Sequence, residues 1–246
     1  WDYFCETKIV LPDLETQKKY ADIYSNLLML SICHEKSFAD LRFITNTFTE
    51  KLVAEYGTEE LGDYISVTDK RNTDDKLGIS ELRGISTSKV FIQSKANTTG
   101  VSFSSYKVVT PGQFAYVADT SRRGDKIALA YNNDTPYIIS SIYTTFEIIN
   151  TEKLLPEFLL LWFKRPEFDR YARFNSWGSA RETFDWVEMQ RVRVPIPPIS
   201  VQKSIVAIYH SVEARKILTE RLKKTIKEIS PVLIKDAKDK VLEAVA

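Results

Sequence analysis

Apolar residues recur at alternating steps of three and four along two long stretches of this chain. In the first stretch the repeating positions are Tyr20, Tyr24, Leu27, Ser31, His34, Phe38, Leu41, Thr45, Phe48 and Leu52, and in the second they are Ile205, Ile208, Val212, Arg215, Thr219, Leu222, Ile226, Ile229 and Leu233. This is the heptad pattern of a helix that packs against another helix through a narrow seam. A helix of about 40 residues is roughly 60 Å long, which exceeds what a compact domain requires. The pattern therefore predicts two long helices that form an antiparallel coiled coil, the second kinked or ended at Pro231.

The sequence between these helices has a different pattern. Short runs with a two-residue period or a β-branched and aromatic composition alternate with turn clusters such as Pro111-Gly112 and Asn132-Asn133-Asp134. The predicted strands are 64–67, 107–109, 114–117, 127–131, 137–139 and 144–149. Prolines at helix starts indicate two helices, over 156–164 and 166–174. We expect one α+β domain built on a curved sheet with few helices.

The opening of the chain recurs near its end, at a constant offset of 185 residues. The matched pairs are Trp1/Trp186, Pro12/Pro197, Gln17/Gln202, Lys18/Lys203, Ile23/Ile208 and Tyr24/Tyr209. An internal repeat outranks other sequence signals for architecture. Each copy reads as a short strand that ends at proline and leads into a long helix, with Asp13 and Ser200 as the expected N-caps.

Composition narrows the class of protein but not the partner. The chain is 43% hydrophobic and 27% charged, has only two cysteines, Cys5 and Cys33, and contains no apolar stretch of membrane-spanning length. These features favour a globular protein of a reducing cytoplasm rather than a disulfide scaffold or a membrane protein. A net charge of +1 does not by itself favour nucleic acid.

The local charge is uneven, however. Residues 83–126 contain seven basic and two acidic residues, and residues 203–240 contain ten basic and five acidic ones, so each segment carries +5. The acidic excess lies elsewhere, including Glu59, Glu60 and Asp63. Any case for DNA must rest on such segments.

Three polar loops of the central region carry residue types that read or grip DNA. Arginine, asparagine and serine contact base edges or phosphates, and lysine contributes affinity that does not depend on sequence. The candidate residues are Arg83, Ser86, Lys89, Lys95, Arg122, Arg123, Lys126, Asn175, Ser176, Trp177, Ser179 and Arg181. For the first two loops a solvated turn is an equally good interpretation; the third, with Trp177 in a polar loop, favours function.

Signals for catalysis are few. Asp134-Thr135-Pro136-Tyr137 is similar to the Asp-Pro-Pro-Tyr tetrapeptide of amino-methyltransferases, but no glycine-rich turn stands upstream, so a simple turn is the favoured interpretation. There is no phosphate-binding loop for ATP. His34 and His210 stand on predicted helices without a second ligand, so no metal site is predicted.

Taken together, the motifs resemble the specificity subunit of type I restriction-modification enzymes. The resemblance rests on Pro197-Pro198-Ile199-Ser200-Val201-Gln202-Lys203 before a heptad helix, on Arg165–Arg181, on Leu82–Ser86 and on Pro111–Val117. It implies a non-catalytic DNA-recognition protein that binds double-stranded DNA, methyltransferase subunits and restriction subunits. It also implies that no cofactor is bound by this chain, with S-adenosylmethionine held by the methyltransferase.

Under this resemblance the chain divides into four parts. Residues 1–12 are a remnant of a preceding recognition domain, 13–57 a conserved coiled-coil helix, 58–197 the target recognition domain, and 198–246 a second conserved coiled-coil helix. Two copies of the chain could also associate through their helices. Two other hypotheses remain open: a fragment of an adenine-N6 DNA methyltransferase, and a helical assembly adaptor without DNA binding.

Overall fold

The computed structural model describes residues 5–6, 11–94, 98, 100–120, 126–179 and 181–245, without the side chains of 38–49 and 242–245. It divides into two compact units, a helical unit (1–48 and 207–246) and a second unit (49–206) that contains the sheet. Most of the expected 1–12 remnant lies outside the described residues. No described helix is both long enough and apolar enough to span a membrane.

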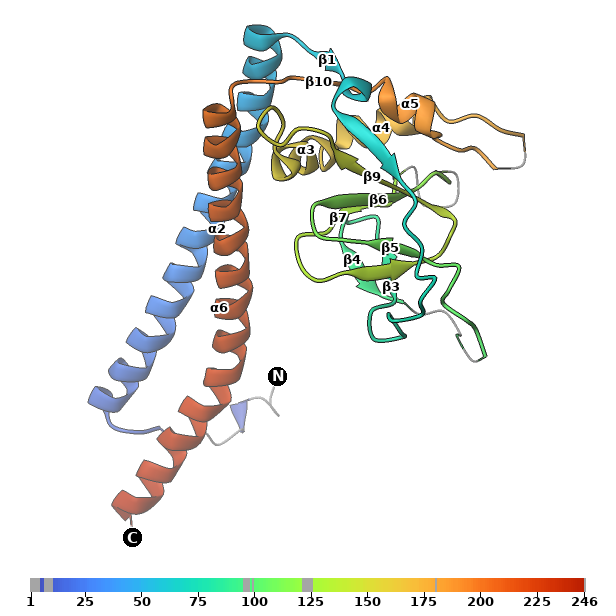
Figure 1. Cartoon of the computed structure of the whole chain (residues 1–246). Coiled ribbons are helices and arrows are strands. Elements are labelled where there is room, and N and C mark those ends of the chain that lie inside the picture. The colour runs from blue at the N-terminus through green and yellow to red at the C-terminus, as the bar shows by residue number, and fades with distance from the viewer. Residues whose placement is uncertain are drawn as a thin grey trace. The chain divides into compact units, whose positions relative to one another are not determined.

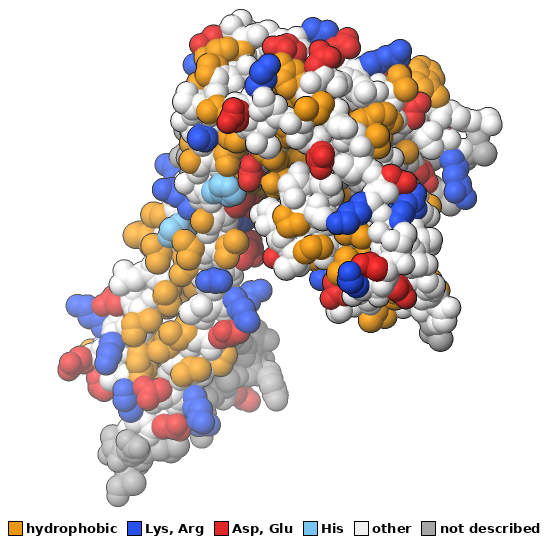
Figure 2. Space-filling model, viewed as in Figure 1, with side chains coloured by type: hydrophobic (Ala, Val, Ile, Leu, Met, Phe, Trp, Pro, Cys, Tyr) orange, Lys and Arg blue, Asp and Glu red, His pale blue; other side chains and the backbone are white. Residues whose placement is uncertain are grey.

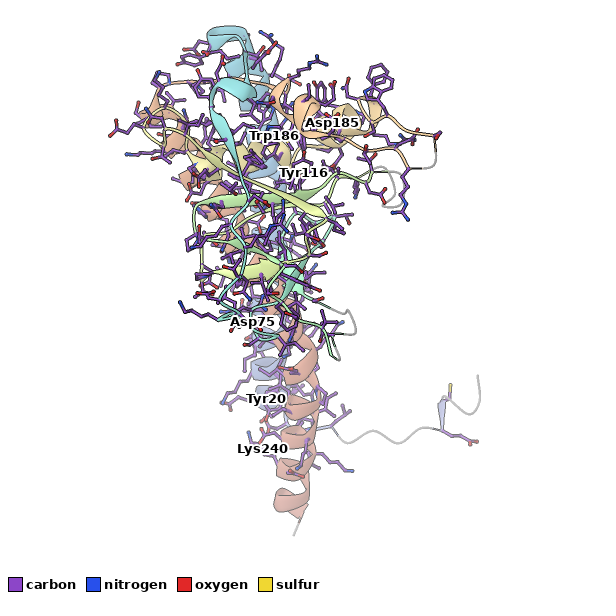
Figure 3. The ribbon with its side chains drawn as sticks, turned by 45° about the vertical axis from the view of Figure 1, so that its right-hand side comes forward. Tyr20, Asp75, Tyr116, Asp185, Trp186 and Lys240 are labelled. Carbon is purple, nitrogen blue, oxygen red and sulfur yellow. The ribbon has the colours of Figure 1, made fainter. Side chains whose placement is uncertain are left out.

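The helical unit contains most of two long helices, α2 (Leu14–Tyr56) and α6 (Ile199–Val245), which run side by side (Figure 1). The Tyr20 hydroxyl donates to Asp236 and accepts from the Lys240 ammonium at 3.0 Å, and Glu35 pairs with Lys223. Figure 3 shows Tyr20 and Lys240 on neighbouring helices. Because the contact partners move toward the start of α6 as one moves along α2, the two helices are antiparallel, as predicted.

Among the described side chains, which leave out 38–49, the seam follows the predicted heptads except at two positions. Ser31, Val212 and Thr219 are the buried residues among the described ones of this unit. Tyr24, however, is exposed while Ile23 is half-buried, and Arg215 points to solvent. The Thr219 hydroxyl donates to the carbonyl of Arg215 at 2.9 Å, so a buried polar seam position is satisfied within its own helix.

The predicted cap of α2 is confirmed, whereas the start and the end of α6 differ from expectation. Asp13 caps α2 as predicted, because its carboxylate accepts from the backbone N–H of Thr16 at 2.8 Å. Ser200 is not the cap of α6, since the helix already begins at Ile199. Pro231 does not end α6, which continues to Val245; the hydroxyl of Ser230 donates to the carbonyl of Ile226 at 2.9 Å, one turn earlier.

The second unit is built around an antiparallel sheet of four strands in the order β2-β9-β6-β7. Its strands are β2 (Ile65–Thr68), β6 (Gln113–Val117), β7 (Leu129–Tyr131) and β9 (Tyr143–Ile148). Three two-stranded sheets accompany it: β1 (Glu59–Glu60) with β10 (Arg193–Val194), β3 (Arg83–Ile85) with β4 (Phe91–Gln93), and β5 (Lys107–Val109) with β8 (Tyr137–Ile139). The fold is the predicted α+β class.

Short helices pack against this sheet. They are the 3₁₀ helix η1 (Leu61–Asp63) and the α-helices α3 (Pro156–Phe163), α4 (Pro166–Phe174) and α5 (Trp186–Gln190). The first two α-helices match the prediction, each with proline at its start. The third was not predicted, and Asp185 caps it by accepting from the backbone N–H of Glu188 at 2.9 Å.

Aromatic side chains form the centre of the core. Phe114 and Phe146, from adjacent strands, stack with ring centres 5.0 Å apart, and Phe163 of α3 meets both rings edge-on. Trp186 packs on Phe146 at 5.6 Å, in the region where Figure 3 labels Tyr116 and Trp186. The five residues of β6 are all buried, so this strand is the centre of the unit.

Where both copies of the sequence repeat are described, from the proline to the glutamine, they share the same hydrogen bond. The Gln17 side-chain amide donates to the carbonyl of Pro12 at 2.6 Å, and the Gln202 amide donates to the carbonyl of Pro197 at 2.8 Å. Gln202 also donates to the carbonyl of Lys153 and accepts from the N–H of Leu155. The repeat is therefore structural, although the second copy is buried and the first is not.

Candidate nucleic-acid interface

The three polar loops singled out in the sequence lie in the second unit, and two ties join them. The first loop is the tight turn of the β3–β4 hairpin, residues 86–89, closed by a hydrogen bond from the N–H of Lys89 to the carbonyl of Ser86 at 3.0 Å. Lys89 has a φ of +62°, a left-handed conformation that a non-glycine residue seldom adopts. The second loop lies between β6 and β7, and its residues 121–125 are outside the described residues. The third runs from 175 to 183.

Asp169 on α4 ties the first loop to the second. Its carboxylate pairs with the Lys89 ammonium and also accepts from the N–H of Ile127 at 3.3 Å. Lys89 was expected to grip phosphate, but this expectation is wrong, because its side chain is only 3% exposed and its charge is used by Asp169. Burial lowers the pKa of the Lys89 ammonium, while Asp169 acts in the opposite direction by favouring the charged form.

Thr120 ties the second loop to the third. Its N–H donates to the carbonyl of Glu182 at 3.2 Å, and its hydroxyl donates to the hydroxyl of Ser176 at 2.9 Å. Ser176 in turn donates to the carbonyl of Ala172 at 2.6 Å. Ser176 is therefore buried and bonded, and the expectation that it contacts DNA is corrected: it anchors the loop.

The third loop has a fixed backbone and an exposed tip. Trp177 and Thr183 exchange two backbone hydrogen bonds, of 3.0 and 3.1 Å, which close a narrow loop over 178–182. Gly178 has a φ of +139°, and a Cβ at this position would lie 2.1 Å from the carbonyl oxygen of Arg181. Only glycine fits there. Arg173 pairs with Glu182 at 2.6 Å and holds the base of the loop.

The remaining predicted residues fall into three groups. Exposed at or beside the joined loops are Lys126, Trp177, Ser179 and Arg181. Partly buried and engaged locally are Arg83, Ser86 and Asn175. Outside the described residues are Lys95, Arg122 and Arg123.

The local engagement of Arg83 limits what it offers to a partner. One guanidinium nitrogen donates to the carbonyl of Ser80 at 2.6 Å, and the group stacks on the Tyr137 ring at 4.6 Å. Asn175 donates its amide to the carbonyl of Tyr171 at 2.9 Å. Both side chains retain partial exposure.

The sequence did not reveal the residues that join the loops. Asp169, Thr120 and Glu182 come from three separate segments, and none of them was assigned a role from the sequence, although Asp169 lies within Arg165–Arg181. Phe174, at the end of α4, was also missed as a surface residue, although it is 80% exposed. Phe168 and Ala172 are four residues apart and form the buried face of this helix. That spacing in 166–174 was the signal in the sequence that could have predicted which face is buried.

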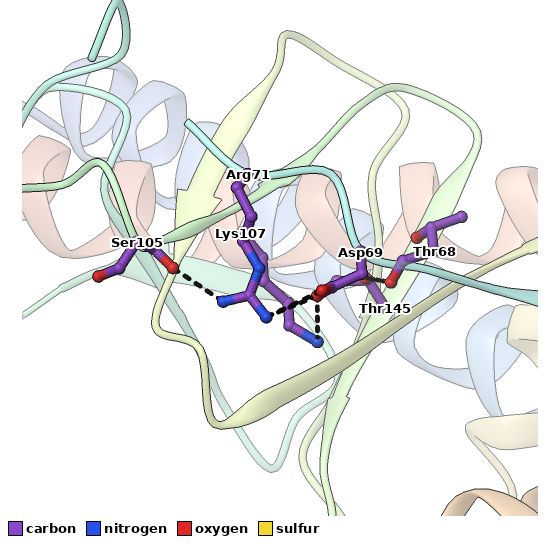
Figure 4. A network of polar contacts seen from close by, with 6 residues as sticks. All are labelled: Thr68, Asp69, Arg71, Ser105, Lys107 and Thr145. Atoms are coloured by element: carbon purple, nitrogen blue, oxygen red, sulfur yellow. Dashed lines mark hydrogen bonds and ion pairs between the residues drawn. The ribbon is translucent and has the colours of Figure 1, made fainter. Parts of the chain in front are cut away.

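A second polar network supports the strand edges elsewhere in this unit (Figure 4). Asp69 pairs with Arg71 at 2.8 Å and with Lys107 at 3.0 Å, and Arg71 donates to the carbonyl of Ser105 at 2.9 Å. The hydrogen bonds from Arg71 and then from Lys107 lower the pKa of Asp69. Lys107 is therefore part of an internal network, which reduces what its charge contributes at the surface.

The segment that is similar to a methyltransferase tetrapeptide forms a turn. The Tyr137 hydroxyl donates to the Asp134 carboxylate at 2.7 Å, and the Asn132 amide donates to the carbonyls of Thr135 and Val109 at 2.8 and 2.9 Å. These contacts agree with the turn interpretation. Among the residues that the structure describes, no group of three or more His, Cys, Asp or Glu side chains is placed to hold a metal ion.

Comparison with known proteins gives the same architecture. A crystal structure of a type I restriction-modification system S subunit from M. genitalium matches with a TM-score of 0.51 at 13% identity, over 92% of this chain and 60% of that chain. The HsdS subunit from Thermoanaerobacter tengcongensis matches with a TM-score of 0.50 at 15% identity, over 93% of this chain and 59% of that one. The chain thus spans about three-fifths of these structures. No curated protein sequence matched the chain.

The fold combines an α+β domain with a pair of antiparallel helices. The family model of the type I restriction modification DNA specificity domain matches residues 40–228. This chain belongs to that family.

Proposed function

We propose that the chain reads a DNA sequence through the three joined loops and directs a separate methyltransferase, and with it a restriction subunit, to that sequence in the cytoplasm. The observation that carries the proposal is the convergence of the loops. Asp169 bonds to Lys89 and Ile127, and Thr120 bonds to Ser176 and Glu182, so described residues of all three loops are tied together. Recognition of a DNA sequence requires several side chains held at fixed positions. The hydrogen bonds and the ion pair between the loops hold them so.

Within this surface the exposed residues take different roles. Arg181 is the described residue best suited to read guanine, since a guanidinium bonds the O6 and N7 atoms together. Lys126 is suited to phosphate and contributes affinity to every sequence alike. The Ser179 hydroxyl can donate a hydrogen bond to a base or to a phosphate. Arg122 and Arg123 belong to the same loop as Lys126 by sequence, and we include them as candidates.

The helical unit is proposed to bind the methyltransferase subunit. Large apolar side chains are exposed on both of its helices: Leu28, Met29, Ile32, Ile217, Leu218, Val232 and Ile234. Figure 2 shows hydrophobic side chains along the visible face of the helices, between charged ones. Exposed apolar patches rimmed by charge mark protein interfaces. The methyltransferase, not this chain, would hold S-adenosylmethionine and perform the methyl transfer.

The test is selection of duplexes from a random-sequence library by the full chain, alone and with its methyltransferase subunit. We expect a defined consensus, and we expect Arg181→Ala to relax preference at one position at a cost of about 1–3 kcal/mol. Lys126→Ala should weaken selected and scrambled duplexes alike and reduce the salt dependence. Lys153→Ala, a substitution on the same unit outside the three loops, is the matched control. Absence of any consensus with the methyltransferase present would contradict the proposal.

Two results would favour the other hypotheses. Binding of S-adenosylmethionine by the isolated chain would favour a methyltransferase fragment. Assembly with the methyltransferase but without any DNA binding would favour a helical adaptor. Self-association through the helices stays a prediction, which sedimentation of the purified chain measures directly.

A further inference from the structure

Large aromatic side chains are exposed at the loop over 175–183, and recognition of bases by hydrogen bonds does not use them. Trp177 is 63% exposed, and Phe174, three residues earlier, is 80% exposed. Burying a tryptophan is strongly favourable, so a tryptophan left at the surface of a folded domain indicates a contact made with a partner. The two aromatic residues stand at the end of α4 and at the start of the loop.

The backbone around Trp177 is held on both sides, which fixes the point from which the exposed side chain extends. Before it, Ser176 is buried and bonded to Ala172 and Thr120. After it, Gly178 adopts a φ of +139°, with no room for a side chain. Trp177 itself exchanges two backbone hydrogen bonds with Thr183. A rigid aromatic side chain loses little conformational freedom when it binds.

The charges nearby indicate what the aromatic residues meet. Arg170, whose side chain is 71% exposed, and Arg181 stand on the same helix and loop as the aromatic pair. The acidic residues of this segment are occupied: Glu182 pairs with Arg173, Glu167 pairs with Arg165 and Arg170, and Asp169 pairs with Lys89. Arg181 is exposed at the same loop, and the Arg170 side chain stays mostly exposed beside Glu167. Exposed aromatic groups beside exposed arginines fit a nucleic acid, because bases offer flat faces and the backbone is negative.

We infer that Trp177, assisted by Phe174, contacts DNA bases by stacking or by partial insertion between base pairs. This inference rests on the proposed function and adds to it a mode of recognition. An inserted apolar side chain unstacks a base step, and the cost depends on the sequence that is deformed. Trp177 would thus contribute specificity at a step that no polar group reads.

The first experiment measures DNA affinity of the full chain over a range of salt concentrations, on a duplex selected by the wild-type chain. We expect Trp177→Ala to weaken binding about 5- to 150-fold, the range for loss of one aromatic–base stack. The slope of log affinity against log salt should not change, because no ion is released by an aromatic contact. Arg181→Ala should lower that slope if Arg181 contacts phosphate, and Trp177→Phe should recover part of the affinity.

The second experiment places 2-aminopurine at successive positions of the same duplex. Unstacking by Trp177 should raise its fluorescence at one step, and Trp177→Ala should abolish the rise. Val187→Ala, which removes an exposed apolar side chain of α5 in the same unit, is the matched control and should change neither readout. Circular dichroism confirms that each variant is folded.

The outcomes separate this inference from the proposed function. If the wild-type chain selects a consensus while Trp177→Ala binds it unchanged, the inference is overturned and DNA recognition stands. If Trp177→Ala keeps DNA affinity but no longer binds the methyltransferase subunit, the loop is a protein contact and the inference is likewise overturned. If the wild-type chain selects no DNA, the proposed function itself fails.

Discussion

The two units of this protein carry the same sequence signature but use it differently. In the helical unit, Gln17 makes one side-chain hydrogen bond, to Pro12, at the exposed start of α2. In the second unit, Gln202 makes the same bond to Pro197 and two more, to Lys153 and Leu155, and is completely buried. The local structure follows from the repeated residues. Its contribution to stability follows from what packs around it.

The two units also differ in how much apolar surface they bury. The second unit encloses a continuous aromatic and aliphatic core, whereas the helical unit buries one apolar side chain, Val212, among its described residues. A narrow seam with polar positions leaves large apolar residues exposed along both helices. The second unit is therefore stabilised internally, and we expect the helical unit to gain stability when a partner covers it.

The largest expected effect is the loss of a central ring. Phe146→Ala removes a completely buried side chain that packs on Phe114, Phe163 and Trp186, and should cost about 3–5 kcal/mol of unfolding free energy. Ile217→Ala, on an exposed position of the helical unit, should change it by less than about 0.5 kcal/mol. Urea unfolding followed by tryptophan fluorescence measures both. Equal effects would mean that the two units do not differ in packing as described.

Breaking the tie at Asp169 should cost nearly as much. Asp169→Asn leaves the Lys89 ammonium buried without a negative partner, and we expect a loss of about 3–5 kcal/mol. The double variant Asp169→Asn/Lys89→Met removes the stranded charge and should recover part of this loss. A double variant less stable than Asp169→Asn would contradict the assignment of Lys89 as a structural residue. Recovery of DNA binding by the double variant would further show that Lys89 makes no essential phosphate contact.

The two repeat glutamines provide the most direct comparison of the units. Gln202→Ala leaves the N–H of Leu155 and two carbonyls without their partner, and should cost about 1–3 kcal/mol. Gln17→Ala loses one hydrogen bond at an accessible position, where water replaces it, and should cost under about 1 kcal/mol. Unfolding free energies of the two variants, measured under the same conditions, decide whether burial sets the difference.

The smallest effect concerns the exposed ion pairs of the helices. The hydrogen bond and charge of Glu35 raise the pKa of Lys223, but both groups face solvent. Lys223→Ala should leave the unfolding midpoint unchanged within error, at low and at moderate salt. A clear loss of stability that disappears at high salt would show that this pair matters more for the antiparallel pairing than its exposure indicates.

The periodicity of the sequence determined most of the secondary structure. The heptads of α2 and α6, the prolines that begin α3 and α4, and the strands around 107–117 and 127–149 were predictable, because each depends on residues close together in the chain. The hairpin of β3 and β4 was missed, since 83–93 contains polar residues and a lysine with positive φ that do not read as strands. Helix α5 was not predicted, because its five residues are too few to show a helical period.

The candidate site, like the secondary structure, was predictable only in part from the sequence. The sequence by itself indicated which loops carry arginine, lysine, serine and tryptophan, because those residue types and their spacing in loops can be read directly. Only the tertiary structure decided that Lys89 and Ser176 are buried anchors and that Trp177 and Arg181 face outward. The partners responsible, Asp169 and Thr120, lie 80 and 56 residues away along the chain, so no local pattern could reveal them. Burial and charge pairing depend on contacts between distant segments, and those contacts exist only once the sheet has brought the loops together.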